Sequence, residues 1–236
     1  MNLTERANPG LHEHVLERAT AAVADRAARV LDIGCGTGAL LVRFRSRGYT
    51  HLQGIDIAPP ADLPGVHFHS LDLDDPRFPV ETGSVDLALA LEVLEHIENV
   101  GAFLAEIHRV LAPTGRVLLT TPNVHSVEAR LRLLLLGQLK QFDSIGDPTH
   151  IYPVFSFPFN RLLTRHGFQV VQRWGFPEDG TSPTSRGALR RLAGLARIFG
   201  LRGDPDGDQL CLVLQRVDQQ GLELQGGKEA MLTGHY

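Results

Sequence analysis

Hydrophobic positions in the first half of the chain follow two spacings in turn. Segments with apolar residues three or four positions apart predict helices over residues 10–27, 38–48 and 99–115. Short apolar runs rich in β-branched residues predict buried strands at 29–34 (RVLDIG), 51–57 (HLQGIDI), 66–72 (VHFHSLD), 84–91 (SVDLALAL) and 115–121 (GRVLLTT). Strands that alternate with helices in this way indicate an α/β fold with a doubly wound, mostly parallel sheet.

The second half departs from that alternation. Helical spacing recurs over residues 126–139, 156–167 and 185–200, and strand-like runs occupy 168–176 and 209–217. We expect a single domain over residues 1–217, with insertions at 122–165 and 177–205 placed around one sheet. Residues 218–236 have no clear period and are expected to be a C-terminal tail.

The bulk composition is that of a globular protein. Of 236 residues, 43% are hydrophobic and 21% are charged, and the formal net charge of −4 provides no global field to recruit nucleic acid. The two cysteines are too few for a disulfide framework. The first ten residues do not resemble a signal peptide, and the run LRLLLLG is far too short to span a membrane. We therefore expect a cytoplasmic protein.

A strand, a glycine-rich turn and a helix start follow one another in the segment ARVLDIGCGTGALL. Glycines at 34, 36 and 38 allow positive φ angles and let a ligand approach the backbone closely. Gly34, Gly36 and Ala39 satisfy the G-x-G-x-x-G/A dinucleotide pattern, and Asp56 follows about 20 residues later. The loop predicts a nucleotide-type ligand, but its spacing alone does not identify which one.

Acids at the ends of successive predicted strands narrow that choice. Asp32, Asp56 and Asp72 close the first three strands, and LEVLEHI follows the fourth. In this ordered set the chain resembles the class I S-adenosylmethionine-dependent methyltransferases, most closely over residues 28–122. The resemblance implies a Rossmann-like, seven-stranded sheet with an antiparallel last strand and helical insertions after strands 5 and 6.

The same resemblance implies that S-adenosylmethionine is the cofactor. Asp32 would orient its amino group and Asp56 its ribose hydroxyls, while Asp72 and the N–H of Leu73 would meet the adenine. Cys35 is expected to pack as a small residue, and the alternative for Asp72 is a turn aspartate. The cofactor-binding candidates are Asp32, Gly34, Cys35, Gly36, Gly38, Asp56, Ile57, Asp72, Leu73 and Leu91.

Methyl transfer to a hydroxyl needs a base, so histidines and carboxylates near the strand ends are candidates, and the histidines are the predicted catalytic residues. His150 lies in the predicted turn GDPTH, and His125 follows the fifth strand in TTPNVHS. The alternatives are that His150 only bonds its own loop and that His125 is an exposed loop residue. His96 is the third candidate, within LEVLEHI.

The segment LEVLEHI also raises the question of a metal. Ubiquinone-pathway O-methyltransferases carry a similar segment, so Glu92, Glu95 and His96 could hold a divalent ion. The alternative is a structural turn into the next helix. We expect the turn, and no metal.

Two further segments are candidate surfaces. Arginines at 186, 190, 191, 197 and 202 occur in a predicted amphipathic helix without acids, which suits an anionic membrane or an acidic acceptor. We nevertheless expect its apolar face to pack on the domain and its arginines to be exposed. Leu133 to Leu136 are expected in the core, with a pocket wall or a dimer contact as alternatives.

The sequence therefore predicts an S-adenosylmethionine-dependent methyltransferase that methylates oxygen on a small-molecule or saccharide-type acceptor. The saccharide reading follows from the similarity of TTPNVHSVEARLRLLLLG to methyltransferases found with glycan biosynthesis. A phenol- or quinone-type acceptor is the alternative. From other classes, an NAD-dependent oxidoreductase and a non-catalytic cofactor-binding module also remain open. We expect no nucleic-acid partner, a monomer or homodimer, and at most a peripheral membrane contact.

Overall fold

The computed structural model describes residues 7–58, 63–75, 77–144, 146–178, 180, 188–201 and 205–217. Seven strands form one sheet in the order β3-β2-β1-β4-β5-β7-β6. Their bounds are β1 Arg29–Ile33, β2 His51–Asp56, β3 Val66–Ser70, β4 Val85–Leu91, β5 Leu111–Pro122, β6 Phe168–Phe176 and β7 Gln209–Arg216. The helices are α1 Leu11–Ala22, α2 Ala39–Ser46, η1 Leu94–His96 (a 3-10 turn), α3 Val100–Val110, α4 Val127–Leu136, α5 Ser156–Arg165 and α6 Ala188–Ile198.

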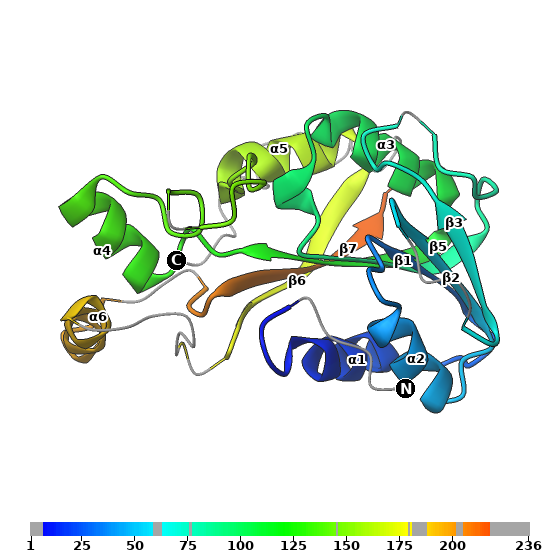
Figure 1. Cartoon of the computed structure of the whole chain (residues 1–236), viewed down its shortest axis with the longest axis horizontal. Coiled ribbons are helices and arrows are strands. Elements are labelled where there is room, and N and C mark those ends of the chain that lie inside the picture. The colour runs from blue at the N-terminus through cyan, green and yellow to red at the C-terminus, as the bar shows by residue number, and fades with distance from the viewer. Residues whose placement is uncertain are drawn as a thin grey trace.

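The strand directions confirm the expected sheet. Strands β1 to β5 pair in parallel, and β7 runs antiparallel to both of its neighbours, β5 and β6. Helices α1 and α2 cover one face of the sheet, and α3 and α5 cover the other (Figure 1). The carboxyl ends of the parallel strands therefore lie at one edge, where ligands bind in open α/β sheets.

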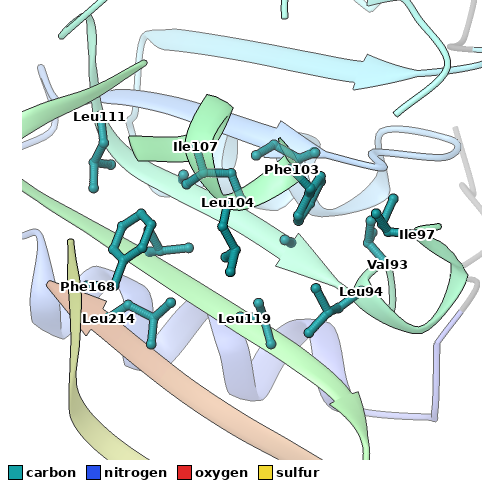
Figure 2. Close-up of a cluster of buried hydrophobic side chains, with 14 of the residues drawn as sticks. Val93, Leu94, Ile97, Phe103, Leu104, Ile107, Leu111, Leu119, Phe168 and Leu214 are labelled. Atoms are coloured by element: carbon teal, nitrogen blue, oxygen red, sulfur yellow. The ribbon is translucent and has the colours of Figure 1, made fainter. Parts of the chain in front are cut away.

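Helix α3 shows how apolar spacing builds the core. Asn99 begins the helix, because its side-chain oxygen accepts a hydrogen bond from the N–H of Ala102 at 3.1 Å. Phe103, Leu104 and Ile107 then recur at helical spacing and are buried against the sheet (Figure 2). Burial of each such side chain contributes about 1.5–3 kcal/mol, so this single stripe fixes the helix on its face.

Two predicted helices end earlier than expected, and part of the predicted chain lies outside the described residues. Helix α1 ends at Ala22 rather than at residue 27. Helix α3 ends at Val110 rather than at residue 115, and β5 begins at once, because a proline at 113 disfavours the helical conformation of Ala112. Residues 186, 187 and 202 of the basic segment and the tail 218–236 lie outside the described residues. No helix in the described ranges is both long enough and apolar enough to cross a bilayer.

Candidate cofactor and acceptor site

A cleft of about 690 Å³ opens at the carboxyl ends of β1, β2 and β4. The glycine loop after β1 forms one side of it, and η1 with the loop around Asp147 and Thr149 forms another. Its lining residues are Ala7, His12, Asp32, Gly34, Cys35, Gly36, Thr37, Leu40, Asp56, Ile57, Leu71, Asp72, Leu73, Asp74, Leu91, Glu92, Val93, His96, Ile97, Asp147 and Thr149. Acids and apolar side chains thus share one cavity of ligand size.

The glycine loop is held close to two neighbouring strands. Gly34 donates its N–H to the carbonyl of Ile55 at 2.8 Å, and Gly36 donates to Oδ2 of Asp56 at 2.8 Å. Gly34 has a φ of 75°, and a Cβ there would lie 2.4 Å from Cγ2 of Val93. Glycine is therefore required at this position by the turn conformation and by the close approach of Val93.

Asp32 is the most perturbed acid of the cleft. It is buried at the penultimate position of β1, and no described residue hydrogen-bonds to its carboxyl group. Burial, and then the charge of Asp56, raises its pKa to about 8. A cationic ligand group beside it would favour its ionised form. The site therefore fits the amino group of S-adenosylmethionine, the cofactor that the sequence implies.

Nine of the ten predicted cofactor-binding residues line this cleft. Gly38 does not line the cleft, and it is the N-cap residue of α2. Cys35 is buried among apolar side chains, and this burial raises the pKa of its thiol. Asp72 also accepts a hydrogen bond from the N–H of Asp74 at 3.1 Å, so it combines the cleft position with the turn role that was its alternative.

The three predicted catalytic histidines occupy different positions. His96 lines the cleft, and its Nδ1 lies 2.9 Å from Oγ1 of Thr149. His150 is not among the lining residues, and its Nδ1 lies 2.9 Å from the carbonyl of Gln141 in its own loop. Its ring packs edge-on against that of His96, with centroids 4.8 Å apart. The structure thus places His150 against His96.

His125 is also outside the cleft lining. Its Nε2 accepts a hydrogen bond from the N–H of Ser156 at 3.1 Å, at the start of α5. This bond joins the turn after β5 to α5.

Glu92 is a cleft-lining acid that is absent from the predicted site set. It follows β4 with a φ of 53°, which is unusual for a residue other than glycine. Oγ1 of Thr120 donates to its Oε1 at 2.8 Å, and Nε2 of Gln209 lies 3.5 Å from its Oε2. Burial raises the pKa of Glu92 to about 7, with a further contribution from the charge of Asp208. The sequence signal that could have identified Glu92 was its position as the first acid of LEVLEHI.

Glu95 lies in η1 and is fully buried. Oγ1 of Thr121 donates to its Oε2 at 3.1 Å, and burial raises its pKa well above the ordinary value. Its backbone carbonyl accepts from the N–H groups of Ile151 and Tyr152, which fixes the loop that carries His150. Donor atoms of Glu95, His96 and His150 lie within 4.8 Å of one another. Among the residues that the structure describes, this trio, rather than Glu92, Glu95 and His96, is the group near the cleft with metal-ligand spacing.

Several other lining residues escaped sequence reasoning. His12 comes from α1, and Asp147 and Thr149 come from the loop after α4. These residues reach the cleft only through the tertiary fold. No local motif around His12 points to a ligand, whereas Asp147 and Thr149 belong to the turn GDPTH that was singled out for His150.

Comparison with known proteins supports the same assignment. A family model described as "Methyltransferase domain" matches residues 5–173. A ubiquinone biosynthesis O-methyltransferase of Rhodopseudomonas palustris is 28% identical over 155 residues, which cover 61% of this chain and 58% of that protein. One from Xanthomonas oryzae pv. oryzae is 35% identical over 141 residues, covering 56% and 57%. The chain thus matches less than two thirds of the length of each of these relatives.

Solved structures share the fold at low identity. The Burkholderia thailandensis 1,6-didemethyltoxoflavin-N1-methyltransferase, solved with S-adenosylhomocysteine, has a TM-score of 0.58 and 18% identity, covering 89% of this chain and 80% of that one. A SAM-dependent methyltransferase from Archaeoglobus fulgidus has a TM-score of 0.59 and 19% identity, covering 87% and 94%. With the glycine loop, the strand-end acids and the family match over residues 5–173, the chain belongs to the methyltransferase-domain family, in its class I, S-adenosylmethionine-dependent branch.

Proposed function

We propose that this protein transfers the methyl group of S-adenosylmethionine to a hydroxyl group of a small molecule, with Glu92 as the base. The observation that carries the proposal is that Glu92 is a lining residue of the cleft and that burial raises the pKa of its carboxyl group to about 7. A hydroxyl loses its proton when it is methylated, so O-methylation needs a base of this kind beside the cofactor. Relatives named as O-methyltransferases support the same chemistry.

The cofactor supplies an activated methyl group, so the chain's own residues mainly bind, orient and handle a proton. In this proposal Asp32 receives the amino group, Asp56 accepts hydrogen bonds from the ribose, and Asp72 with Leu73 meets the adenine. The glycine loop leaves room for the cofactor against the backbone. Apolar side chains of Leu91, Val93 and Ile97 limit water in the cleft.

Glu92 is held ready for proton transfer by its two neighbours. Thr120 and Gln209 come from adjacent strands and fix the carboxyl group at the end of β4. Near neutral pH a substantial fraction of this carboxyl is ionised and able to accept the acceptor's proton. The Thr120 hydroxyl stabilises the ionised form, because it donates a hydrogen bond to it.

The histidines take different roles in this proposal. His96 lines the cleft, and burial lowers its pKa, so its imidazole is neutral at neutral pH and can hydrogen-bond the acceptor. His150 packs against the ring of His96, and His125 ties the turn after β5 to α5. We therefore assign His150 and His125 as positioning residues and His96 as an acceptor-binding residue.

The acceptor class follows from the polar rim of the cleft. His96, Asp147 and Thr149 offer hydrogen-bonding groups beside Glu92, which suits a polyhydroxylated, saccharide-type acceptor. A phenol- or quinone-type acceptor is the second candidate, and the similarity to ubiquinone biosynthesis O-methyltransferases favours it. Both candidates present a hydroxyl to Glu92, so the proposed chemistry is the same.

The test uses the pH dependence of methyl transfer. Methylation of a panel of simple sugars, catechols and amines with labelled S-adenosylmethionine identifies an acceptor. With that acceptor, kcat should rise through about pH 7 as Glu92 loses its proton. Glu92→Gln keeps the size and the hydrogen-bonding oxygen but cannot accept the proton. It should lower kcat by roughly 10²–10⁴ and remove the titration.

His150→Gln is the matched comparison, because it changes a neighbouring group outside the cleft lining. As a positioning residue, His150 should affect KM more than kcat, and the titration near pH 7 should persist in this variant. A Glu92→Gln enzyme with the wild-type kcat and pH profile would contradict the assignment of the base. Methylation of amines but of no hydroxyl in the panel would contradict O-methylation itself.

A further inference from the structure

Helices α4 and α6 form a unit at one end of the molecule, beyond the ends of β5 and β6 (Figure 1). The two helices pack against each other. Asp206 joins them, because its carboxylate accepts from the N–H of Val127 at 3.0 Å and from Nε of Arg197 at 2.8 Å. The unit is therefore a defined part of the fold rather than a pair of independent helices.

The contact between the helices leaves the large apolar side chains of α6 outside. Ala193, the residue that faces inward, is 1% exposed, and Arg197, one turn later, faces Asp206. Leu195 is 55% exposed, Ile198 81% and Phe199 83%. The expectation that the apolar face of this helix packs on the domain is thus wrong, because its small residues make the contact instead.

Helix α4 ends in a similar way. Its first turn is buried beside Asp206, but Leu134, Leu135 and Leu136 in its last turn are all more than half exposed. The expectation that these leucines belong to the core is wrong. Together with Leu195, Ile198 and Phe199 they form what we call the α4–α6 surface. Exposed apolar groups gathered in this number mark an interaction site.

The charge beside these side chains is positive. Helix α6 contains arginines at 190, 191 and 197 and no acid, although the whole chain carries a formal charge of −4. Arg191 and Leu195 are four residues apart and therefore share one face of the helix, and Phe199 continues this spacing in the turn that follows α6. Arg191 is exposed there with the apolar groups. A cation among apolar side chains on one helix face suits the boundary between lipid headgroups and acyl chains.

We propose that the α4–α6 surface binds an anionic lipid bilayer. The apolar side chains enter the headgroup boundary, and Arg191 meets lipid phosphates. A bilayer accepts side chains that project from the end of a domain without a complementary binding pocket, whereas a protein partner would need one. Neither exposed apolar area nor positive charge alone gives stable membrane attachment. The presence of both on one surface is therefore the feature that favours a membrane.

The test is cosedimentation with vesicles of phosphatidylglycerol and phosphatidylcholine, compared with vesicles of phosphatidylcholine alone. The native chain should pellet with the anionic vesicles and remain in the supernatant with the neutral ones. Ile198→Glu/Phe199→Glu should reduce the bound fraction to background. Arg191→Glu should weaken binding roughly fivefold or more, with most of the effect lost at high salt.

Phe157→Glu is the matched control, because this phenylalanine is 64% exposed but lies on α5. It should bind vesicles like the native chain. All three variants change exposed side chains, so their melting temperatures and their affinity for S-adenosylhomocysteine should match the native chain. If the native chain binds vesicles but transfers no methyl group, this result would contradict the proposed function and leave the membrane proposal intact.

Equal recovery of the native chain in the supernatant with both kinds of vesicle would overturn the membrane proposal. So would binding that Ile198→Glu/Phe199→Glu leaves unchanged. Sedimentation velocity without lipid completes the test. A dimer that this double variant dissociates, combined with no vesicle binding, would assign the surface to a second copy of the chain.

Discussion

Removal of the Asp56 carboxylate should weaken cofactor binding. Among substitutions of single strand-end acids that leave the fold intact, this one should have the largest effect. One oxygen, Oδ2, accepts from the N–H of Gly36 at 2.8 Å, and the other, Oδ1, accepts from the N–H of Ala58 at 3.1 Å. The residue therefore fastens the glycine loop to the end of β2. In the proposed complex it also accepts hydrogen bonds from the two ribose hydroxyls.

The magnitude follows from these bonds. Hydrogen bonds to a charged group contribute about 1.5–3 kcal/mol each, and the part-exposed position of Asp56 favours the lower figure. Loss of two ribose bonds in Asp56→Ala should therefore cost about 3 kcal/mol, or about 150-fold in Kd. Asp56→Asn keeps an oxygen for Gly36 but loses the charge, so its cost should be about 1–2 kcal/mol.

Calorimetric titration with S-adenosylhomocysteine measures both variants, and NAD serves as the competing ligand, for which we expect no binding. Asp75→Ala is the control, because this exposed acid is outside the cleft lining. The affinities should fall in the order native and Asp75→Ala, then Asp56→Asn, then Asp56→Ala. A native Kd in a folded Asp56→Ala protein would refute the role of this acid, and tight NAD binding without S-adenosylhomocysteine binding would refute the cofactor itself.

Other predictions concern Asp32, the core and metal dependence. Binding of S-adenosylhomocysteine at pH 7 should release a proton from Asp32, because its pKa of about 8 would fall beside the ligand's amino group. Calorimetric titrations in buffers of different ionisation enthalpy should detect this proton release. The release should be absent in Asp32→Asn. Because that folded-state pKa lies above the unfolded value of about 4, the ligand-free protein should lose stability as pH rises from about 4 to about 8, and melting curves should show a smaller loss for Asp32→Asn. Phe103→Ala should lower the free energy of unfolding by about 3–5 kcal/mol in urea titrations, since the side chain is buried between α3 and the sheet; a loss below about 1 kcal/mol would show that this site repacks. Treatment with EDTA should leave methyl transfer unchanged, because Nδ1 of His96 is bonded to Thr149 and burial favours the protonated form of Glu95; activity that disappears and returns with Mg²⁺ or Zn²⁺ would identify a metal enzyme.

Local patterns predicted the sheet, and nine of the ten residues named for the cofactor line one cleft. Each strand follows from a short apolar run, and the acids that close β1 and β2 meet at one edge because parallel strands end together. The segment 168–176 was predicted with the observed bounds of β6. The glycine loop could be recognised from its own residues, although bonds from Gly34 and Gly36 to the end of β2 hold it in place.

The acceptor side was less predictable, because it depends on contacts between distant segments. The loop with His150 is fixed through the backbone carbonyl of Glu95, more than fifty residues earlier in the chain. The outward apolar face of α6 accompanies its contact with α4 and the burial of Ala193, which helical spacing cannot reveal. The pKa of Glu92 rises to about 7 through burial in the folded chain and the charge of Asp208, which is distant in sequence, and neither effect is visible in the local sequence.

The position of β7 has a consequence for the order in which the sheet can assemble. Strand β7 comes last in the chain but lies between β5 and β6, and it provides the hydrogen-bonded neighbour through which β6 joins the sheet. While the chain emerges from the ribosome, β6 can therefore be synthesised completely and still have no strand beside it. The edges of β5 and β6 stay open to other chains until residues 209–216 arrive. Slow synthesis of this last stretch should favour aggregation, whereas the first five strands can already pair.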